Sequence, residues 1–196
     1  MGTGYGSAMT VLRQGLLDGR TVALAGGVTR DMSEALSGLG ARMAELELGL
    51  ELDEERASSW AGAAGPLHAL VYDARRAFGG GGEDGLRDCL ERGWVAVRGV
   101  ATGALIPAGA GKVVLVGPRP DAGPFAAAAR DALENLARTL SVEWARYGVG
   151  TVAIAPGAST TDGEITELVC FLVSPAGEYF TGCVFELGRV DLIRSS

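Results

Sequence analysis

The apolar residues of this chain gather in short runs that alternate with stretches of helical character. The runs predict strands at 20–26, 68–74, 112–117, 150–157 and 180–188. The stretches between them predict helices at 30–40, 54–65, 84–106, 124–148 and 162–175. The segment 41–53 alternates in part and predicts one or two further short strands, whereas the glycine-rich segment 77–85 predicts a flexible loop.

Strands that alternate with helices, without charged interruption, predict a parallel sheet with helices on both faces. We therefore expect a three-layer α/β fold, doubly wound through right-handed crossovers. No linker or internal repeat divides the chain, so residues 16–196 are expected to form one Rossmann-like domain. Residues 1–15 are expected to be an N-terminal arm that is flexible or bound to a partner.

Composition narrows the classes of function. The net charge of −7 argues against nucleic acid as a ligand, because phosphate binding requires a basic face. No apolar run reaches the ~18–20 residues of a membrane span, and the start of the chain does not have the pattern of a signal peptide, so we expect a cytoplasmic protein without a membrane segment. The three cysteines lack metal or redox spacing, and the single histidine, His68, opens a strand, so no metal site is expected.

The segment from Val22 to Leu36, VALAGGVTRDMSEAL, has the order of a nucleotide-binding turn, with a buried strand followed by glycines and a helix. Bare glycines in such a turn let the backbone approach a pyrophosphate and expose the N–H groups of the helix start. In this chain Arg30 and Met32 stand where further glycines are expected. The strand, turn and helix of a nucleotide site are therefore present, but the glycines that would face the phosphates are replaced.

The order of elements from Leu16 to Asp191 resembles the short-chain dehydrogenase/reductase family. The stretch LENLARTLSVEWARYGVGTVAIAPG is similar to the long helix and the following strand of that family, and EITELVCFLVSPAGEYFTGCVFELG is similar to its last helix and last strand. The resemblance implies a truncated form of the family fold. The chain is shorter between the second and third strands, and again between Gly157 and Glu164, where family members carry a helical lid over the substrate.

The resemblance also implies that this chain binds no cofactor. The family's first turn reads Thr-Gly-x-x-x-Gly-x-Gly, which places Gly26 on the first glycine and Arg30 and Met32 on the second and third. We expect the Met32 side chain to fill the space of the phosphate. Arg30 as a phosphate anchor is the alternative, although its charge cannot restore the close approach of the backbone.

The catalytic positions of the family carry other residues here. Its acid/base tyrosine falls on Ala126, the lysine four positions later falls on Arg130, and its serine falls on Pro118. A shift of one residue would place Phe125 and Ala129 at the first two positions, again without a phenol or an ammonium group. Lys112, the single lysine of the chain, lies before the strand that precedes this helix. We therefore expect no catalytic residues.

The best-preserved stretches correspond to the helices that typically contact a second subunit in this family. We expect a catalytically silent subunit that assembles with an active, NAD(P)-binding paralogue, as a heterodimer or heterotetramer, and supports its fold or its substrate site. Apolar residues at helical spacing, and in the last helix and strand, are the candidate interface: Trp94, Val97, Ala101, Leu136, Leu140, Trp144, Phe171 and Phe185.

Three alternatives stay open. The apolar helix residues could line the chain's own core instead of an interface. Asp73, Arg75, Arg130 and Asp121 could gather near the former active site and carry out a non-redox reaction such as an isomerisation or a dehydration, or they could be surface ion-pair partners. The chain could also be a small-molecule binding or regulatory module, or a homodimer without a partner enzyme.

Overall fold

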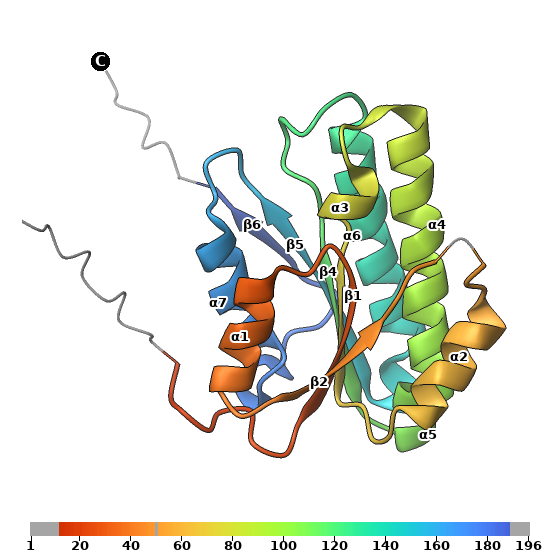
Figure 1. The fold of residues 1–196 in the computed structure, drawn as a ribbon, viewed down its shortest axis with the longest axis vertical. Coiled ribbons are helices and arrows are strands. Elements are labelled where there is room, and N and C mark those ends of the chain that lie inside the picture. Colours follow the sequence, from red (N-terminus) through yellow and green to blue (C-terminus); the bar gives the residue numbers. More distant parts are fainter. Residues whose placement is uncertain (1–11, 50, 189–196) are drawn as a thin grey trace, which may run out of the picture.

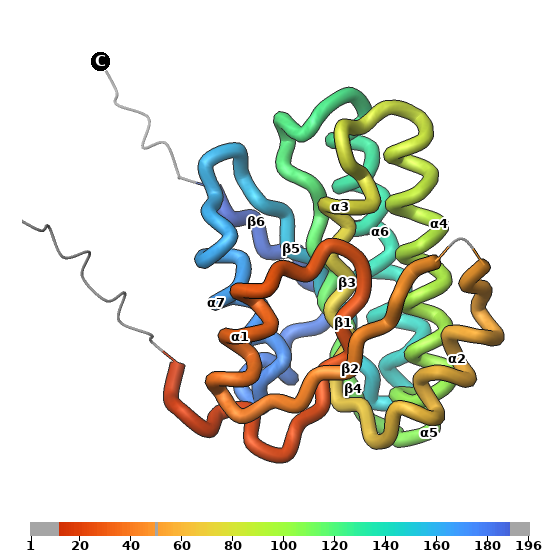
Figure 2. Tube along the Cα trace, in the orientation of Figure 1, coloured from red at the N-terminus to blue at the C-terminus, as the bar shows by residue number. Residues whose placement is uncertain are grey.

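The computed structural model describes residues 12–49 and 51–188, which form one parallel sheet covered by helices (Figures 1 and 2). The strands are β1 (Thr21–Gly26), β2 (Arg42–Leu46), β3 (Ala69–Asp73), β4 (Gly111–Val116), β5 (Val149–Pro156) and β6 (Val184–Leu187). The helices are α1 (Arg30–Gly38), α2 (Glu54–Ala63), α3 (Arg75–Phe78), α4 (Gly82–Val100), α5 (Ile106–Ala108), α6 (Ala126–Glu143) and α7 (Asp162–Leu172).

The strands lie in the order β2-β1-β3-β4-β5-β6, and every neighbouring pair is parallel. The second strand, β2, therefore lies on one side of β1 within the sheet, and the third strand, β3, lies on the other side of β1. The common doubly wound order, 3-2-1-4-5-6, places one more strand outside the second strand. Within the described residues β2 is the edge strand, which agrees with the shortening expected between the second and third strands.

Helices cover both faces of the sheet, which confirms the predicted three layers (Figure 1). On one face α1 and α7 bury an apolar cluster that contains Met32, Leu36 and Val169. On the other face α2, α4 and α6 bury a second cluster that contains Val97 and Leu133. Side chains of the inner strands point alternately into the two clusters, because successive residues of a strand face opposite sides of the sheet.

One connection has the opposite hand from the others. The steps from β1 to β2 and from β5 to β6 run in opposite directions across the sheet, yet both pass over the face of α1 and α7 (Figure 1). The steps through α2, α4 and α6 share the hand of the first, which is the usual right hand. The step through α7 is therefore left-handed, and the prediction of right-handed crossovers is wrong there. This path lets α7 cover side chains of β4 and β5 such as Val114 and Ile154.

Two local predictions differ from the structure. The helix expected over 84–106 begins earlier, at Gly82, and continues through a π-helical turn, Ala101–Leu105, into α5. The wider turn precedes Pro107, whose ring cannot fit against the carbonyl of an unbroken α-helix. The flexible loop expected over 77–85 is a short turn between α3 and α4, because its glycines pack closely against the backbone of Pro124 and Gly123.

The N-terminal end of the described chain is packed rather than free. Leu17 is fully buried and its N–H donates to the carbonyl of Leu39 over 2.8 Å, and Leu12 lies partly buried against the α1/α7 cluster. Residues 1–11 of the predicted arm lie outside the described residues, as do residues 189–196 of the predicted domain. Among the helices that the structure describes, none combines the length and the apolar character needed to cross a membrane.

Candidate functional site

The order of the strands reverses between β1 and β3, and ligands of open α/β sheets bind at such a point, at the carboxyl edge of the sheet and outside the ends of the strands. A cleft of about 530 Å³ opens there, beside the ends of β1 and β2 and next to α3 and α4. Leu24, Ala25 and Gly26 contribute to its lining from β1, and charged residues surround it: Glu45, Glu47, Arg76, Asp88 and Arg92. This edge is the candidate functional site.

The glycine turn after β1 fits closely against the end of β3. Gly26 has φ +85°, and a Cβ at this position would lie 2.3 Å from the carbonyl oxygen of Asp73. The N–H of Gly27 donates to that same carbonyl over 2.7 Å. The first glycine of the nucleotide-type turn is therefore required by the chain's own packing, and its presence alone does not indicate a bound phosphate.

The start of α1 is closed by the chain itself. The Thr29 side chain caps the helix by accepting a hydrogen bond from the N–H of Met32 over 3.2 Å. Arg30 points outward, with its side chain 88 % exposed, and pairs with Glu34 over 2.6 Å. The Met32 side chain is fully buried in the α1/α7 cluster, so the expectation that it fills the phosphate space is wrong. Its apolar side chain is stabilised more by the core than by the polar helix start.

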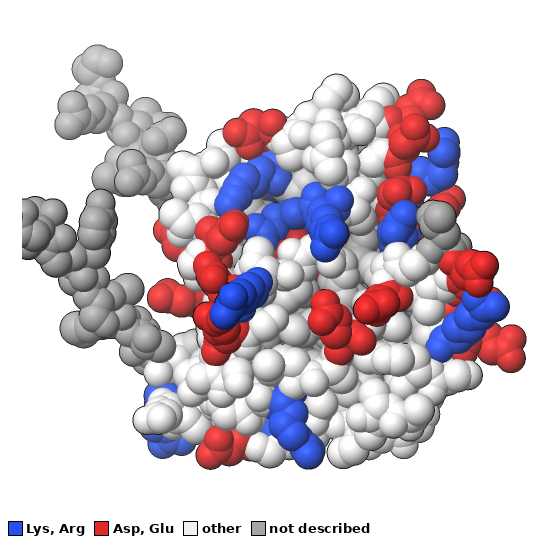
Figure 3. All heavy atoms as spheres, in the orientation of Figure 1, with Lys and Arg blue, Asp and Glu red and all other residues white. Residues whose placement is uncertain are grey.

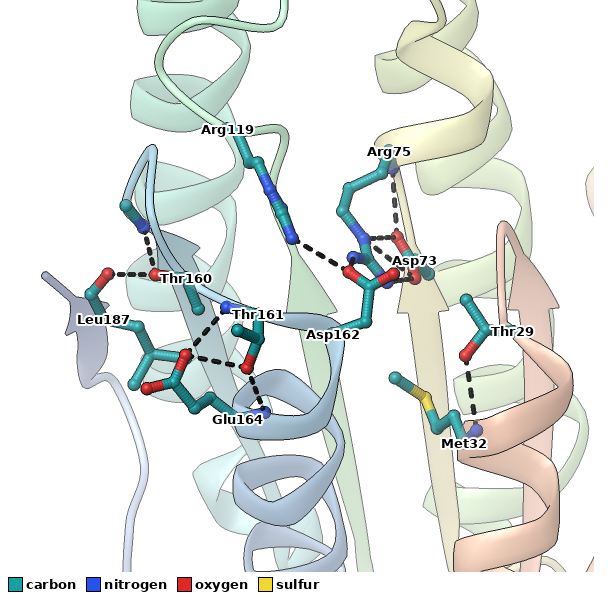
Figure 4. A network of polar contacts seen from close by, with 11 residues as sticks. Thr29, Met32, Asp73, Arg75, Arg119, Thr160, Thr161, Asp162, Glu164 and Leu187 are labelled. Atoms are coloured by element: carbon teal, nitrogen blue, oxygen red, sulfur yellow. Dashed lines mark hydrogen bonds and ion pairs between the residues drawn. The ribbon is translucent and has the colours of Figure 1, made fainter. Parts of the chain in front are cut away.

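Four charged side chains form an ion-pair network across the carboxyl edge (Figure 4). Asp73, the last residue of β3, is fully buried and accepts from Arg75 Nε over 2.9 Å and from Nη2 over 2.6 Å. Arg75 Nη1 reaches Asp162 Oδ1 over 2.6 Å, and Arg119 Nη2 reaches the same oxygen over 2.9 Å. The network therefore links the ends of β3 and β4 to the start of α7.

Burial by itself would lower the pKa of Arg75, but hydrogen bonds and charges from Asp73 and Asp162 outweigh it and leave the pKa raised. The guanidinium group stays protonated at any physiological pH and cannot act as an acid or a base. Asp73 and Arg75 meet as the sequence hypothesis of a non-redox site required, but in the structure they neutralise one another.

Arg130 ties two strand ends together instead of joining this network. Its Nη1 donates to the carbonyl of Pro118, after β4, over 2.8 Å and to that of Pro156, at the end of β5, over 2.6 Å. Asp121 is exposed and lies in the loop between β4 and α6. Of the four residues proposed to gather, the ion-pair network therefore contains Asp73 and Arg75, and its other members are Arg119 and Asp162.

The loop between β5 and α7 is short and firmly attached. Thr160 Oγ1 accepts from the N–H of Gly157 over 2.8 Å and donates to the carbonyl of Leu187 (Figure 4). Thr161 and Glu164 then form a capping box at the start of α7. The segment contains no helix between β5 and α7, in agreement with the expected loss of a lid.

Comparison with known proteins identifies the architecture. No protein-family model matches the chain, and no curated protein matches it. A mutant short-chain dehydrogenase/reductase from Serratia marcescens is 19 % identical over 88 % of this chain and 97 % of its own, with a TM-score of 0.69. For a hydroxysteroid dehydrogenase from Escherichia coli the identity is 18 % over 89 % and 98 % of the two chains, with a TM-score of 0.67. The chain has the short-chain dehydrogenase/reductase fold.

The sequence resemblance assigns the catalytic tyrosine of the family to Ala126, which begins α6 and is 2 % exposed. The alternative register places Phe125 there, half exposed and in the left-handed backbone region with φ 66°. Neither side chain carries a hydroxyl group. The resemblance assigns the serine to Pro118, which is buried, and the lysine to Arg130, whose guanidinium group already donates to two carbonyls.

The described tyrosines lie away from the carboxyl edge or are engaged elsewhere. Tyr72 is fully buried, its hydroxyl donates to the carbonyl of Cys89 over 2.7 Å, and burial raises its pKa. Tyr147 and Tyr179 lie at the opposite edge, just before β5 and β6. Tyr5 falls outside the described residues. Within 12–49 and 51–188, the reductase fold therefore presents no phenol to a substrate at this edge.

The single lysine also lies at the opposite edge. Lys112, at the start of β4, is 1 % exposed and its Nζ donates to the carbonyl of Gly177 over 2.8 Å and to that of Phe180. Burial lowers its pKa to about 8. Its role here is to hold the loop before β6, and no other ammonium side chain exists in the sequence. The described residues also contain no group of three His, Cys, Asp or Glu side chains that could hold a metal ion.

The structure divides the candidate interface residues into two groups. Four of them are buried in the chain's own core: Val97, Ala101, Leu140 and Trp144. Leu140 and Trp144 also line a groove between α4 and α6. Leu136 is partly buried against that core. Phe171 and Phe185 are partly buried and both pack on the ring of Phe180, with centroids 5.8 and 5.5 Å apart. The alternative that these apolar residues line the chain's own core is thus correct for four of the eight candidates.

Trp94 remains a candidate interface residue, because it is 40 % exposed on α4. It lines the same groove of about 600 Å³ between α4 and α6, together with Ile106, Tyr147 and Val142. Val142 is 79 % exposed, and sequence reasoning missed it because a single valine on a charged helix turn gives no periodic signal. Arg119 and Asp162 were missed because each follows a different strand and their meeting depends on the tertiary fold.

Proposed function

We propose that this chain is a non-catalytic subunit with the reductase fold, which assembles with an intact, NAD(P)-dependent reductase subunit and supports its folding or its substrate site. The observation that carries the proposal is the composition of the carboxyl edge. The positions of tyrosine, lysine and serine hold Ala126, Arg130 and Pro118, and an ion pair between Arg75 and Asp162 crosses the edge.

Carbonyl reduction needs a proton donor beside the developing alkoxide. The charged side chains in the network are guanidinium and carboxylate groups paired with one another, and a guanidinium group does not release its proton in proteins. The β5–α7 loop lacks a lid helix, so a reacting substrate would stay in contact with water. These features support a role that does not depend on hydride transfer within this chain.

The groove between α4 and α6 supports assembly with a partner. Trp94 and Val142 expose apolar surface beside Arg98 and Arg146, an arrangement of apolar centre and polar rim that is typical of interfaces. Tryptophan is among the residues that contribute most to binding when it is enclosed by a partner. The cleft of about 530 Å³ beside β1 and β2 favours a second candidate function, the binding of a small molecule without chemistry.

The first prediction concerns nucleotides. In a fluorescence titration with NADH and with NADPH, the isolated chain is expected to show no saturable binding below millimolar concentration. The start of α1 is capped by Thr29, and a buried methionine rather than a glycine lies between this helix and the sheet. Saturable binding at micromolar nucleotide would contradict the proposal and support the small-molecule module.

The second prediction concerns the partner. The tagged chain, co-expressed with each full-length reductase of this fold from the same genome, is expected to co-purify with one of them. Trp94→Glu should weaken that complex by about 10- to 100-fold, because it places a charge at the centre of the groove. Met43→Glu is the matched control: Met43 is 37 % exposed on the edge strand, and its replacement should leave affinity unchanged.

Size-exclusion chromatography and titration by isothermal calorimetry measure these effects, and a thermal melt of each variant checks that the fold is retained. The proposal fails if the chain purifies as a stable monomer and captures none of the reductases. The assignment of the groove around Trp94 as the contact surface fails if Trp94→Glu and Met43→Glu bind the partner equally well.

A further inference from the structure

The side chains of Arg75 and Arg119 converge on one carboxylate oxygen. Arg75 comes from α3 and Arg119 from the loop after β4, and they reach Asp162 Oδ1 over 2.6 and 2.9 Å (Figure 4). Two guanidinium groups directed at one point form a strong recognition site for an oxyanion, because each donor is charged and planar. Asp162 is the oxyanion that occupies this point in the chain as it stands.

Arg75 is held in place without Asp162. Arg75 is fixed by the buried carboxylate of Asp73, which accepts from its Nε, its Nη2 and its backbone N–H. The Arg119 side chain is 25 % exposed and follows the buried Pro118 in the loop after β4, and its ion pair is with Asp162. Because Arg75 is positioned in advance, less entropy is lost when a ligand reaches it.

The Asp162 side chain, in contrast, can rotate away from the two guanidinium groups. Its side chain is 54 % exposed, whereas Arg75 is 16 % exposed. It is the first residue of α7, but the capping box of that helix is formed by Thr161 and Glu164, so the helix start does not depend on the Asp162 side chain. A rotation of this side chain into solvent would free the two guanidinium groups and leave the fold unchanged.

The surroundings favour a negative ligand. The site lies at the carboxyl edge of the sheet, beside the N-terminus of α7, an eleven-residue helix whose dipole attracts anions. The whole chain has a net charge of −7, yet a group of basic side chains gathers over this edge (Figure 3). Once Asp162 turns away, the positive charge of Arg119 is no longer balanced within the network.

We infer that Arg75 and Arg119 form a binding site for a small molecule bearing a carboxylate or phosphate group, and that Asp162 occupies the site as an internal competitor when the ligand is absent. The ligand's oxyanion replaces the aspartate carboxylate between the two guanidinium groups, and no covalent change is involved. This inference goes beyond the proposed function and does not depend on it, because the binding is a property of this chain alone.

The test removes the competitor. Because an attached group acts at an effective concentration in the millimolar range or above, the unchanged chain is expected to bind malonate or inorganic phosphate weakly. Asp162→Asn should bind about 10- to 100-fold more tightly, as measured by calorimetry and by the rise in melting temperature at constant ionic strength. Asp84→Asn is the matched control, since Asp84 forms an exposed ion pair with Arg87 on α4.

The double change Asp162→Asn with Arg119→Gln should abolish the gain, and Arg119→Gln alone should abolish the weak response of the unchanged chain even if the Asp162 variant folds poorly. A preference for malonate would identify the ligand as a carboxylate, and a preference for phosphate would identify it as a phosphate compound. Equal binding by Asp162→Asn and Asp84→Asn, or a gain that survives the loss of Arg119, would overturn the inference.

Discussion

Replacing Asp73 by alanine is expected to lower the free energy of unfolding by about 3 kcal/mol. The carboxylate is fully buried, and its loss leaves the Arg75 guanidinium, 16 % exposed, without its principal partner. Removing one partner of a buried pair is costly, because Nε and Nη2 of Arg75 lose their acceptor inside the protein and the charge keeps only the half-exposed Asp162 as its partner. Urea denaturation followed by circular dichroism measures the change.

Two further variants separate the cause from general damage. Asp84→Ala removes a carboxylate that is 94 % exposed and should change stability by about 0.5 kcal/mol or less. Asp73→Ala combined with Arg75→Met should recover much of the loss, because no unpaired charge remains at the site. If Asp73→Ala is as mild as Asp84→Ala, the network does not stabilise the carboxyl edge.

Replacing Gly26 by alanine should destabilise the chain by about 2–4 kcal/mol. Gly26 has φ +85°, a conformation that costs other residues about 1–2 kcal/mol. The new Cβ would also lie 2.3 Å from the carbonyl oxygen of Asp73, so β1 and β3 would have to separate where the glycine turn meets the ion-pair network. The same denaturation experiment measures the loss.

Gly19 provides a matched control within the same chain. Its φ is +76°, close to that of Gly26, but a Cβ there would meet no atom within 4 Å. Gly19→Ala should therefore show the backbone cost alone, about 1 kcal/mol. Equal effects of the two substitutions would mean that the close contact between Gly26 and β3 does not affect the free energy of unfolding.

The architecture could be predicted because it depends on local patterns. The run HALVYDA predicted a strand at 68–74 that the structure places at Ala69–Asp73, and the helix expected at 162–175 is α7. Two predictions failed because tertiary packing decided them. The left-handed step through α7 depends on which face β4 and β5 leave uncovered, and the glycine-rich turn before α4 is set by the backbone of Gly123 and Pro124.

The contents of the candidate site were predictable only in part. The helix expected at 124–148 is α6, which begins at Ala126 and contains Arg130. Sequence patterns could not show that Arg119 and Asp162 meet, since 43 residues separate them and a long-range fold brings them together. For Met32, the position in the motif suggested the phosphate space, whereas burial of its apolar side chain directs it into the core.

The outer strand β2 has a consequence for behaviour in concentrated solution. An unpaired strand edge can template the addition of strands from other molecules and so lead to aggregation. In β2 the exposed side chains include Arg42 and Glu45, and the strand is five residues long. Charged side chains and the short length both disfavour pairing of β2 with a strand of another molecule, so a reductase fold that ends at β2 can stay dispersed without a further strand beside it.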